Sequence, residues 1–293
     1  MSIKDTLRGV GLDPLAIDDI IERALAEDLG PQWIDPTSEA IFDVSVTGVA
    51  DIVAREPGVV AGLAVAHAVF ARVDASGTAK FEQRVADGNP VERGDVLATV
   101  SGPVRYLLMA ERTVLNILSR MSGVASHTAR WARELSGTGT TVLDTRKTNP
   151  GLRILDKYAV RAGGGDNKRM GLFDAAMVKD NHKFAAGSVS AAYEAVTKKF
   201  PGLPVQVEVD TMEEAREAIA AGVGFLLCDN MSPQLLREVV EMVAGRAELE
   251  ATGNITVDRA REYAESGVDY ISSGALTHSS PILDIALDIR TDN

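Results

Sequence analysis

Polar and charged residues that could bind a small anionic molecule follow a series of short apolar runs in the second half of the chain. Basic residues can pair with carboxylate or phosphate oxygens, and arginine can do so bidentately. Acidic residues are hard oxygen ligands suited to magnesium or to a developing positive charge. This mixture fits a substrate with several negative charges and a cationic transition state. In chain order the groups that follow apolar runs are Asp144–Lys147, Lys179–His182, Glu208 with Asp210, Asp229–Asn230, Glu250 with Thr252–Asn254, and Ser272–Gly274. A further basic pair, Lys168–Arg169, stands beside the three glycines Gly163–Gly165.

The apolar runs that precede these groups predict strands of a parallel sheet. They alternate with helical patterns, and their continuous apolar character is typical of strands buried on both faces. Ligands of such folds lie at the carboxyl ends of the strands. Solvation explains any one polar strand end, but it does not explain a whole ring of charges. Six strands predict an incomplete α/β barrel, with strands at 141–144, 175–178, 205–209, 225–227, 248–251 and 270–272.

The first part of the chain predicts a mixed sheet with helices. Apolar residues at helical spacing follow Asp13-Pro14, and the pattern stops at Gly30-Pro31. A long helical pattern over 106–135 leads into the barrel region, with a break expected at Ser122-Gly123. The apolar segment 282–289 is expected to dock back on the first domain. The other expected elements are strands at 45–55, 80–85 and 96–100 and a helix at 63–73.

Composition limits the classes of partner and the compartment. With 293 residues, of which 45% are hydrophobic, the chain can bury one large core or two. The net charge of -12 argues against nucleic acid or an anionic membrane as partner, so an anionic substrate needs a local basic cluster. The single cysteine, the N-terminus without an apolar signal region and the lack of a long apolar stretch predict a soluble cytoplasmic protein.

Several of these residues stand in a long ordered pattern that resembles the signature of quinolinate phosphoribosyltransferases. The pattern continues outside the barrel region, where Ala110–Thr113 resembles the interdomain helix of that family. Within the barrel region it comprises Thr145–Arg153, Lys157–Val160, Gly163–Gly165, Asn167, Arg169, Gly171-Leu172, Asp174, Lys179–His182, Val207–Asp210, Asp229-Asn230, Thr252–Ile255 and Ser273–Ser279.

The resemblance implies a fold, a domain division and an assembly. The fold is α/β, an open (incomplete) α/β barrel with an N-terminal α/β sandwich domain. Residues 1–115, joined by the C-terminal segment 277–293, would form the sandwich domain, and residues 116–276 the catalytic barrel. The family also implies a homodimer, in which Arg112 of one subunit reaches the site of its partner.

The resemblance further implies phosphoribosyl transfer from phosphoribosyl pyrophosphate (PRPP) to quinolinate, with decarboxylation to nicotinate mononucleotide. The expected catalytic residues are Lys147, Glu208, Asp229 and Arg112, and Glu208 and Asp229 would hold Mg²⁺. The expected substrate-binding residues are Arg112, Thr145, Arg146, Lys147, Lys168, Arg169, Lys179, Glu208, Asp229, Thr252, Gly253, Asn254, Ser273, Gly274 and Ala275.

One position departs from the family pattern and leaves alternatives open. The family usually has histidine where this chain has Lys168, and lysine is a flexible point charge that lacks the acceptor nitrogen of neutral imidazole. Its effect on substrate preference and pH dependence is therefore open, and a related phosphoribosyltransferase for another carboxylated ring remains an alternative. A Schiff-base lyase using Lys179 is a second alternative. A non-enzymatic carrier or ligand-sensing module on the N-terminal sheet is a third.

Overall fold

The computed structural model describes residues 2–74 and 77–290. Their contacts divide the chain into two compact units. The first comprises Met1–His127, Asn149–Gly164 and Ser279–Asn293, and the second comprises Thr128–Thr148 and Gly165–His278. Residues 116–127 and 149–164 thus fall in the first unit, whereas the sequence prediction placed them in the barrel domain.

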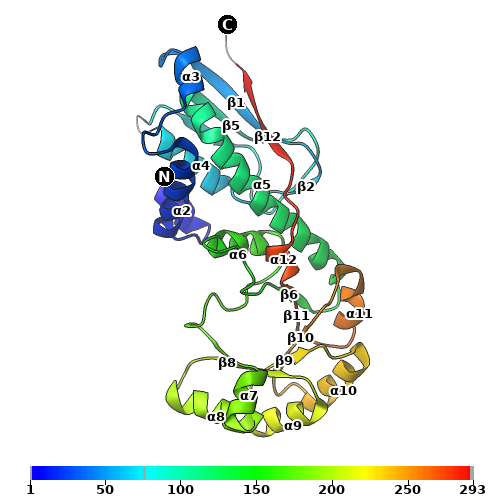
Figure 1. The fold of residues 1–293 in the computed structure, drawn as a ribbon. Coiled ribbons are helices and arrows are strands. Elements are labelled where there is room, and N and C mark those ends of the chain that lie inside the picture. The colour runs from blue at the N-terminus through cyan, green and yellow to red at the C-terminus, as the bar shows by residue number, and fades with distance from the viewer. Residues whose placement is uncertain (1, 75–76, 291–293) are drawn as a thin grey trace. The chain divides into compact units, whose positions relative to one another are not determined.

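The first unit contains a four-stranded antiparallel sheet and several helices (Figure 1). The sheet order is β12-β1-β5-β3, with β1 at Thr47–Ala54, β3 at Lys80–Gln83, β5 at Val96–Pro103 and β12 at Ile285–Arg290. A two-stranded pair joins β2 (Gly58–Val59) to β4 (Pro90–Val91). The helices are α1 (Ile3–Gly9), α2 (Pro14–Leu29), α3 (Pro36–Ile41), α4 (Leu63–Val73) and α6 (Arg153–Ala162).

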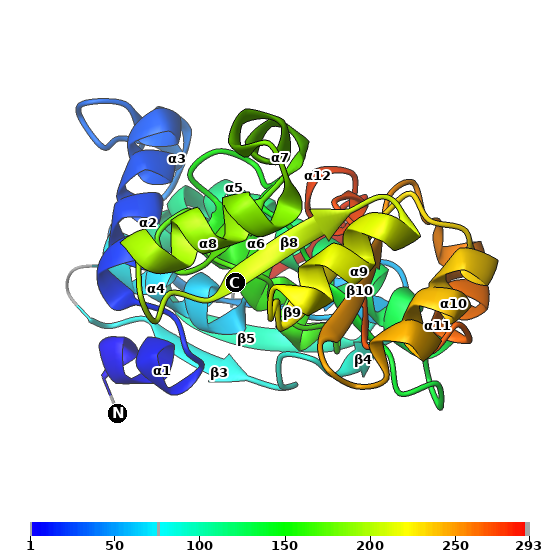
Figure 2. The ribbon, with the colours of Figure 1, turned by 90° about the horizontal axis from the view of Figure 1, so that it is seen from below.

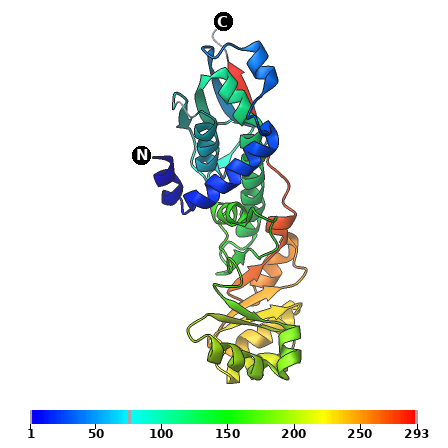
Figure 3. The same cartoon turned by 60° about the vertical axis from the view of Figure 1, so that its left-hand side comes forward.

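Local sequence signals explain where the helices of this unit begin. The Asp13 side chain accepts a hydrogen bond from the backbone N–H of Leu15 (3.1 Å), and Pro14 stands at the first helical position of α2. The buried residues Ile17, Ile20, Ile21 and Leu25 form the inner face of α2. Figure 3 gives a second view of α2 within this unit.

The C-terminal apolar segment docks on the first unit as predicted. Strand β12 pairs with β1 in antiparallel register, from Val49 opposite Arg290 to Ala54 opposite Ile285. An ion pair between Arg290 and Asp51 (2.6 Å) strengthens this edge of the sheet. Strands β1 and β12, which lie more than 200 positions apart in the sequence, are therefore neighbours in one sheet.

The expected break in the long helix is wrong, because α5 runs without interruption from Val104 to Glu134. Its Ser122 hydroxyl accepts a hydrogen bond from the backbone N–H of Ala61 (3.0 Å). A Cβ atom at Gly123 would collide with the backbone of Pro281 and Ile282. These small residues serve close packing of neighbouring chain segments, and they do not interrupt the helix.

The second unit is built on a six-stranded, wholly parallel sheet. Its order is β6-β11-β10-β9-β8-β7, and within the described residues the end strands β6 and β7 are not paired with each other, so the sheet stays open. This confirms the predicted incomplete α/β barrel. The strands are β6 (Thr141–Leu143), β7 (Ala176–Val178), β8 (Val205–Val209), β9 (Phe225–Asp229), β10 (Glu248–Thr252) and β11 (Tyr270–Ser272).

Helices connect these strands, and α8 and α9 contact the sheet at β7 and β8 (Figure 2). The buried strand residues Val207, Leu226 and Ile271 make the centre of the sheet apolar. Among the described residues, no helix combines the length and the apolar character needed to cross a membrane. The helical elements are α7 (Asp180–Ala186), α8 (Val189–Lys199), α9 (Met212–Ala220), α10 (Pro233–Val243), the 3₁₀ turn η1 (Val257–Arg259), α11 (Ala260–Ala264) and α12 (Ala275–His278).

Candidate active site

A polar cleft of about 760 Å³ lies at the carboxyl ends of the strands of the second unit. Every residue predicted from the sequence to bind substrate lines this cleft except Arg112. Arg112 lies on α5 in the first unit, where its side chain is exposed. The lining residues are Thr145, Arg146, Lys147, Lys168, Arg169, Met177, Lys179, Glu208, Leu227, Asp229, Asn230, Thr252–Ile255, Ser272–Ala275 and His278.

Two neighbouring guanidinium groups, those of Arg146 and Arg169, supply positive charge to the cleft. Burial lowers the pKa of Arg169, and the like charge of Arg146 lowers it further. The Arg169 Nη1 atom donates a hydrogen bond to the Ala175 carbonyl (2.9 Å), which fixes the direction of the side chain. Two cations held together in a partly buried place favour binding of an anion with more than one negative charge.

Lys179 and Glu208 form an ion pair across the ends of β7 and β8. The Lys179 Nζ atom lies 2.6 Å from Glu208 Oε2. The backbone N–H of Lys179 donates to His182 Nδ1 (3.0 Å), so His182 orients the start of α7 and does not line the cleft. Half of the Lys179 side chain remains exposed, at 49%, so the ammonium stays accessible to a ligand.

The carboxylates of Glu208 and Asp229 come from the adjacent strands β8 and β9. Burial raises the pKa of Asp229, and the negative charge of Glu208 raises it further. Two close carboxylates with this mutual repulsion fit a divalent cation, and Mg²⁺ commonly binds one or two protein carboxylates together with substrate phosphates. The described residues contain no cluster of three or more His, Cys, Asp or Glu side chains that could hold a metal alone.

Glycines shape the opposite part of the cleft. Gly253 has a φ of +98°, and a Cβ there would lie 2.8 Å from the Asn230 backbone nitrogen. At Gly274 an added Cβ would lie 2.8 Å from the Lys147 side chain and 3.1 Å from His278 Nε2. Backbone without side chains can approach a phosphate group closely, so these loops are suited to anion binding.

A buried ion pair in the wall of the cleft was not predicted from the sequence. Lys168 Nζ donates a hydrogen bond to Glu250 Oε1 (2.6 Å), and Glu250 is fully buried on β10. Glu250 Oε2 lies 2.5 Å from the same nitrogen but outside hydrogen-bonding geometry. Asp144 fixes the adjacent backbone by accepting the Lys168 N–H (2.9 Å). The available signal was the position of Glu250 between the apolar residues Leu249 and Ala251 of an expected buried strand, where a carboxylate requires a cationic partner.

Two apolar residues that line the cleft were also missed: Met177 and Leu227. Their side chains give the site apolar surface of the kind a planar ring can contact. Nothing in the sequence separates them from ordinary core residues, because their types and spacing are those of buried strands. Only the fold selects them as lining residues.

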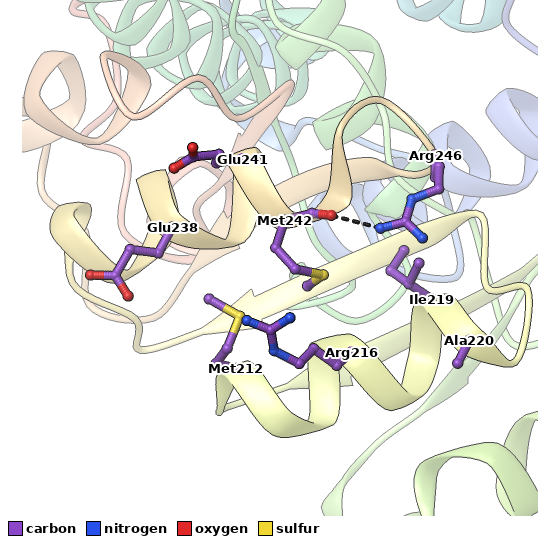
Figure 4. A pocket seen from close by; sticks show the side chains of 8 residues that line it. All are labelled: Met212, Arg216, Ile219, Ala220, Glu238, Glu241, Met242 and Arg246. Atoms are coloured by element: carbon purple, nitrogen blue, oxygen red, sulfur yellow. Dashed lines mark hydrogen bonds between the residues drawn. The ribbon is translucent and has the colours of Figure 1, made fainter.

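A separate cavity of about 700 Å³ lies between α9 and α10 (Figure 4). Arg246 there donates to the Met242 carbonyl at the end of α10 (2.6 Å) and to the Val243 carbonyl (2.9 Å). This cavity shares no lining residue with the cleft at the strand ends. The convergent cations and carboxylates line the cleft at the strand ends and not this cavity.

Comparison with known proteins shows similarity along nearly the whole chain. Family models described as quinolinate phosphoribosyl transferase match residues 35–122 (N-terminal domain) and 124–288 (C-terminal domain). A nicotinate-nucleotide pyrophosphorylase [carboxylating] of Mycobacterium leprae is 44% identical over 277 residues, which cover 94% of this chain and 97% of the relative. A probable enzyme of the same name from Bacillus subtilis is 38% identical over 283 residues, covering 96% of each. The crystal structure of NadC from Streptococcus pyogenes has a TM-score of 0.92 at 40% identity, covering 96% of this chain and 99% of that one.

Proposed function

The chain belongs to the quinolinate phosphoribosyltransferase family, and we propose that the cleft of its second unit is the active site for the family reaction. In that reaction the quinolinate nitrogen bonds to C1′ of PRPP, the bond from C1′ to pyrophosphate breaks, and the adjacent carboxylate leaves as carbon dioxide. The product is nicotinate mononucleotide, a precursor in de novo NAD synthesis. The proposal rests on one observation, the convergence of Arg146, Arg169 and Lys179 with Glu208 and Asp229 in one cleft.

The cations would hold the two carboxylates of quinolinate. Burial and, to a smaller extent, the positive charge of Arg146 lower the pKa of Arg169, so a dianion bound between the two guanidinium groups would relieve their repulsion. Lys179 and Lys168 line the same cleft, and Lys147 would lie between the ring and PRPP. Fixing both carboxylates orients the ring nitrogen toward C1′, which supplies the proximity component of catalysis.

Glu208 and Asp229 would face the ribose and pyrophosphate. Their carboxylates can stabilise the positive charge that develops at C1′ as the bond to pyrophosphate lengthens. The same two groups would hold Mg²⁺, which when bound neutralises charge on the departing pyrophosphate. After transfer the ring nitrogen carries a positive charge, so the electron pair left by carbon dioxide is stabilised on the ring until the carbon takes a proton.

The loops at Thr252–Asn254 and Ser273–Ala275 would cradle the 5′-phosphate of PRPP. The positive φ of Gly253 and the close approach at Gly274 leave room for backbone N–H groups to reach phosphate oxygens. The Thr145 hydroxyl accepts the Lys147 N–H (3.1 Å), which fixes the backbone at the base of the Lys147 side chain. These groups position PRPP and take no covalent part.

We further propose a homodimer in which Arg112 completes the site of the partner subunit, and a cytoplasmic location. Arg112 is exposed on α5 and is therefore available to another chain. Mixing an Arg112→Ala variant with a Lys179→Ala variant tests this arrangement. Each variant alone should lack activity, and the mixture should recover up to about one quarter of it through dimers with one intact site. No recovery after subunit exchange would rule out the shared site.

A product assay tests the reaction itself. Purified protein is incubated with PRPP and magnesium together with quinolinate or, in parallel, nicotinate, and nucleotides are separated chromatographically. We expect nicotinate mononucleotide from quinolinate alone, which would also show that Lys168 substitutes for the usual histidine. No product from either acid would favour the second candidate, a relative that acts on another carboxylated ring, and a panel of pyridine and pyrimidine carboxylates would follow.

A further inference from the structure

Lys183 on α7 is a nearly buried lysine surrounded by carboxylates of three different segments. Only 9% of its side chain is exposed. Its Nζ atom lies 2.9 Å from Asp180 Oδ1 on α7, 3.3 Å from Asp210 Oδ2 in the loop after β8, and 2.9 Å from Glu214 Oε1 on α9. Three carboxylates around one ammonium leave an excess of negative charge at this position.

This cluster stands next to both members of the Lys179–Glu208 pair. Asp180 directly follows Lys179, and Asp210 lies two residues after Glu208. Glu214 also accepts the backbone N–H of Asp210 through Oε2 (2.8 Å), so the same carboxylate binds Lys183 and the loop after β8. Lys183 thereby joins the segment that carries Lys179 to the segment that carries Glu208.

We propose that Lys183 is a positioning residue that engages Asp180, Asp210 and Glu214 and so keeps Lys179 directed into the cleft. Asp180 is 66% exposed and Asp210 is 40% exposed, so without Lys183 both could attract the Lys179 ammonium away from Glu208. The uncompensated carboxylates would also repel an anionic substrate that approaches Lys179. The inference rests on the proposed function, because it assigns Lys179 to quinolinate binding.

A set of matched variants separates this role from a purely structural one. Lys183→Met removes the charge and retains the aliphatic chain, and Lys183→Arg retains the charge. Lys183→Met with Asp180→Asn removes the most exposed competitor for Lys179. Lys198→Met is the control for loss of one positive charge, because Lys198 is exposed on α8 and does not line the cleft. For each variant KM for quinolinate, kcat and the thermal midpoint are measured.

For Lys183→Met we expect KM for quinolinate to rise about tenfold, the scale of one uncompensated charge in a partly screened site. We expect kcat to change less than threefold. Adding Asp180→Asn should return KM for quinolinate to within about threefold of its value in the unmodified protein. The variants Lys183→Arg and Lys198→Met should each keep a KM close to that of the unmodified protein.

An unchanged KM in folded Lys183→Met would overturn the proposal, and so would a raised KM that Asp180→Asn leaves unaltered. If Lys183→Met does not fold, Lys183→Met with Glu214→Gln replaces it under the same criteria, because it leaves no unpaired Glu214 carboxylate. Absence of turnover in the unmodified protein would instead overturn the proposed function, so the two failures are distinguishable.

Discussion

Lys168 and Glu250 form a buried ion pair in which the ammonium nitrogen lies 2.6 Å from one carboxylate oxygen and 2.5 Å from the other. The side chains are 7% and 0% exposed. Burial lowers the pKa of Lys168 and raises that of Glu250, while the pairing opposes both changes. Lys168, which stands where the family usually has histidine, therefore has Glu250 as its counter-ion.

Breaking this pair should cost much of the stability of the second unit. Lys168→Met leaves a buried carboxylate without its cation, and we expect the free energy of unfolding to fall by about 3–5 kcal/mol. Replacing both partners, with Lys168→Met and Glu250→Leu, should recover most of the loss, because the unpaired charge is gone. Urea unfolding measures both. If Lys168→Met and the double variant lose equal stability, the pair is not coupled as described.

Glu208→Ala should abolish turnover and largely spare quinolinate binding. The carboxylate is expected to act at the ribose and pyrophosphate, so kcat should fall by at least about 100-fold, as for loss of a single electrostatic catalytic group. Arg146 and Arg169 remain in place to hold quinolinate, whereas Lys179 loses its partner Glu208, so quinolinate binding should weaken by no more than about tenfold. Steady-state kinetics and calorimetric titration with quinolinate measure the two effects. Glu213→Ala, an exposed change on α9, is the control. Undiminished turnover in Glu208→Ala would remove the residue from the mechanism.

Gly253→Ala should weaken PRPP binding. The added methyl group meets the Asn230 backbone at a φ of +98°, so the phosphate loop must move. We expect KM for PRPP to rise at least about tenfold with little change in quinolinate affinity. Gly245→Ala is a matched control, because Gly245 also has positive φ (+73°) and an added Cβ meets no atom within 4 Å. Equal effects of the two changes would attribute the loss to general backbone strain.

Asp174→Ala should loosen the loop that follows Arg169 and raise KM for quinolinate. Asp174 accepts the backbone N–H groups of Met170 (2.6 Å) and Gly171 (3.0 Å). Burial opposes ionisation, but these hydrogen bonds outweigh it and lower the pKa of Asp174 below its ordinary value of 3.8. The stabilisation is therefore present above about pH 4 and is lost as pH falls through the lower folded-state pKa.

The difference in urea midpoint between the unmodified protein and Asp174→Ala should accordingly be constant near neutral pH and shrink below about pH 4. Unfolding curves from pH 7 down to pH 3 measure this trend. A difference that grows as the pH falls would contradict the assigned sign.

The sequence alone determined the strands of the second unit and most of the residues at their ends. Continuous apolar runs such as Phe225–Cys228 are too uniform for a half-exposed sheet, so they predicted the open parallel sheet correctly. Because parallel strands align their carboxyl ends, the sequence assigns Arg146, Glu208 and Asp229 to one cleft, and all three line it. Their chemical roles remain predictions.

Tertiary structure decided the features that depend on partners distant in sequence. Lys168 and Glu250 are 82 residues apart, and Lys183 and Glu214 are 31 apart, so no local pattern pairs them. The continuity of α5 through Ser122-Gly123 was likewise settled by Ala61 and Pro281, which pack against those small residues. Periodicity and residue type report local conformational preference and burial. They do not identify which residue becomes the counter-ion of a buried charge or which backbone segment packs against a glycine, because those partners meet only when distant segments fold together.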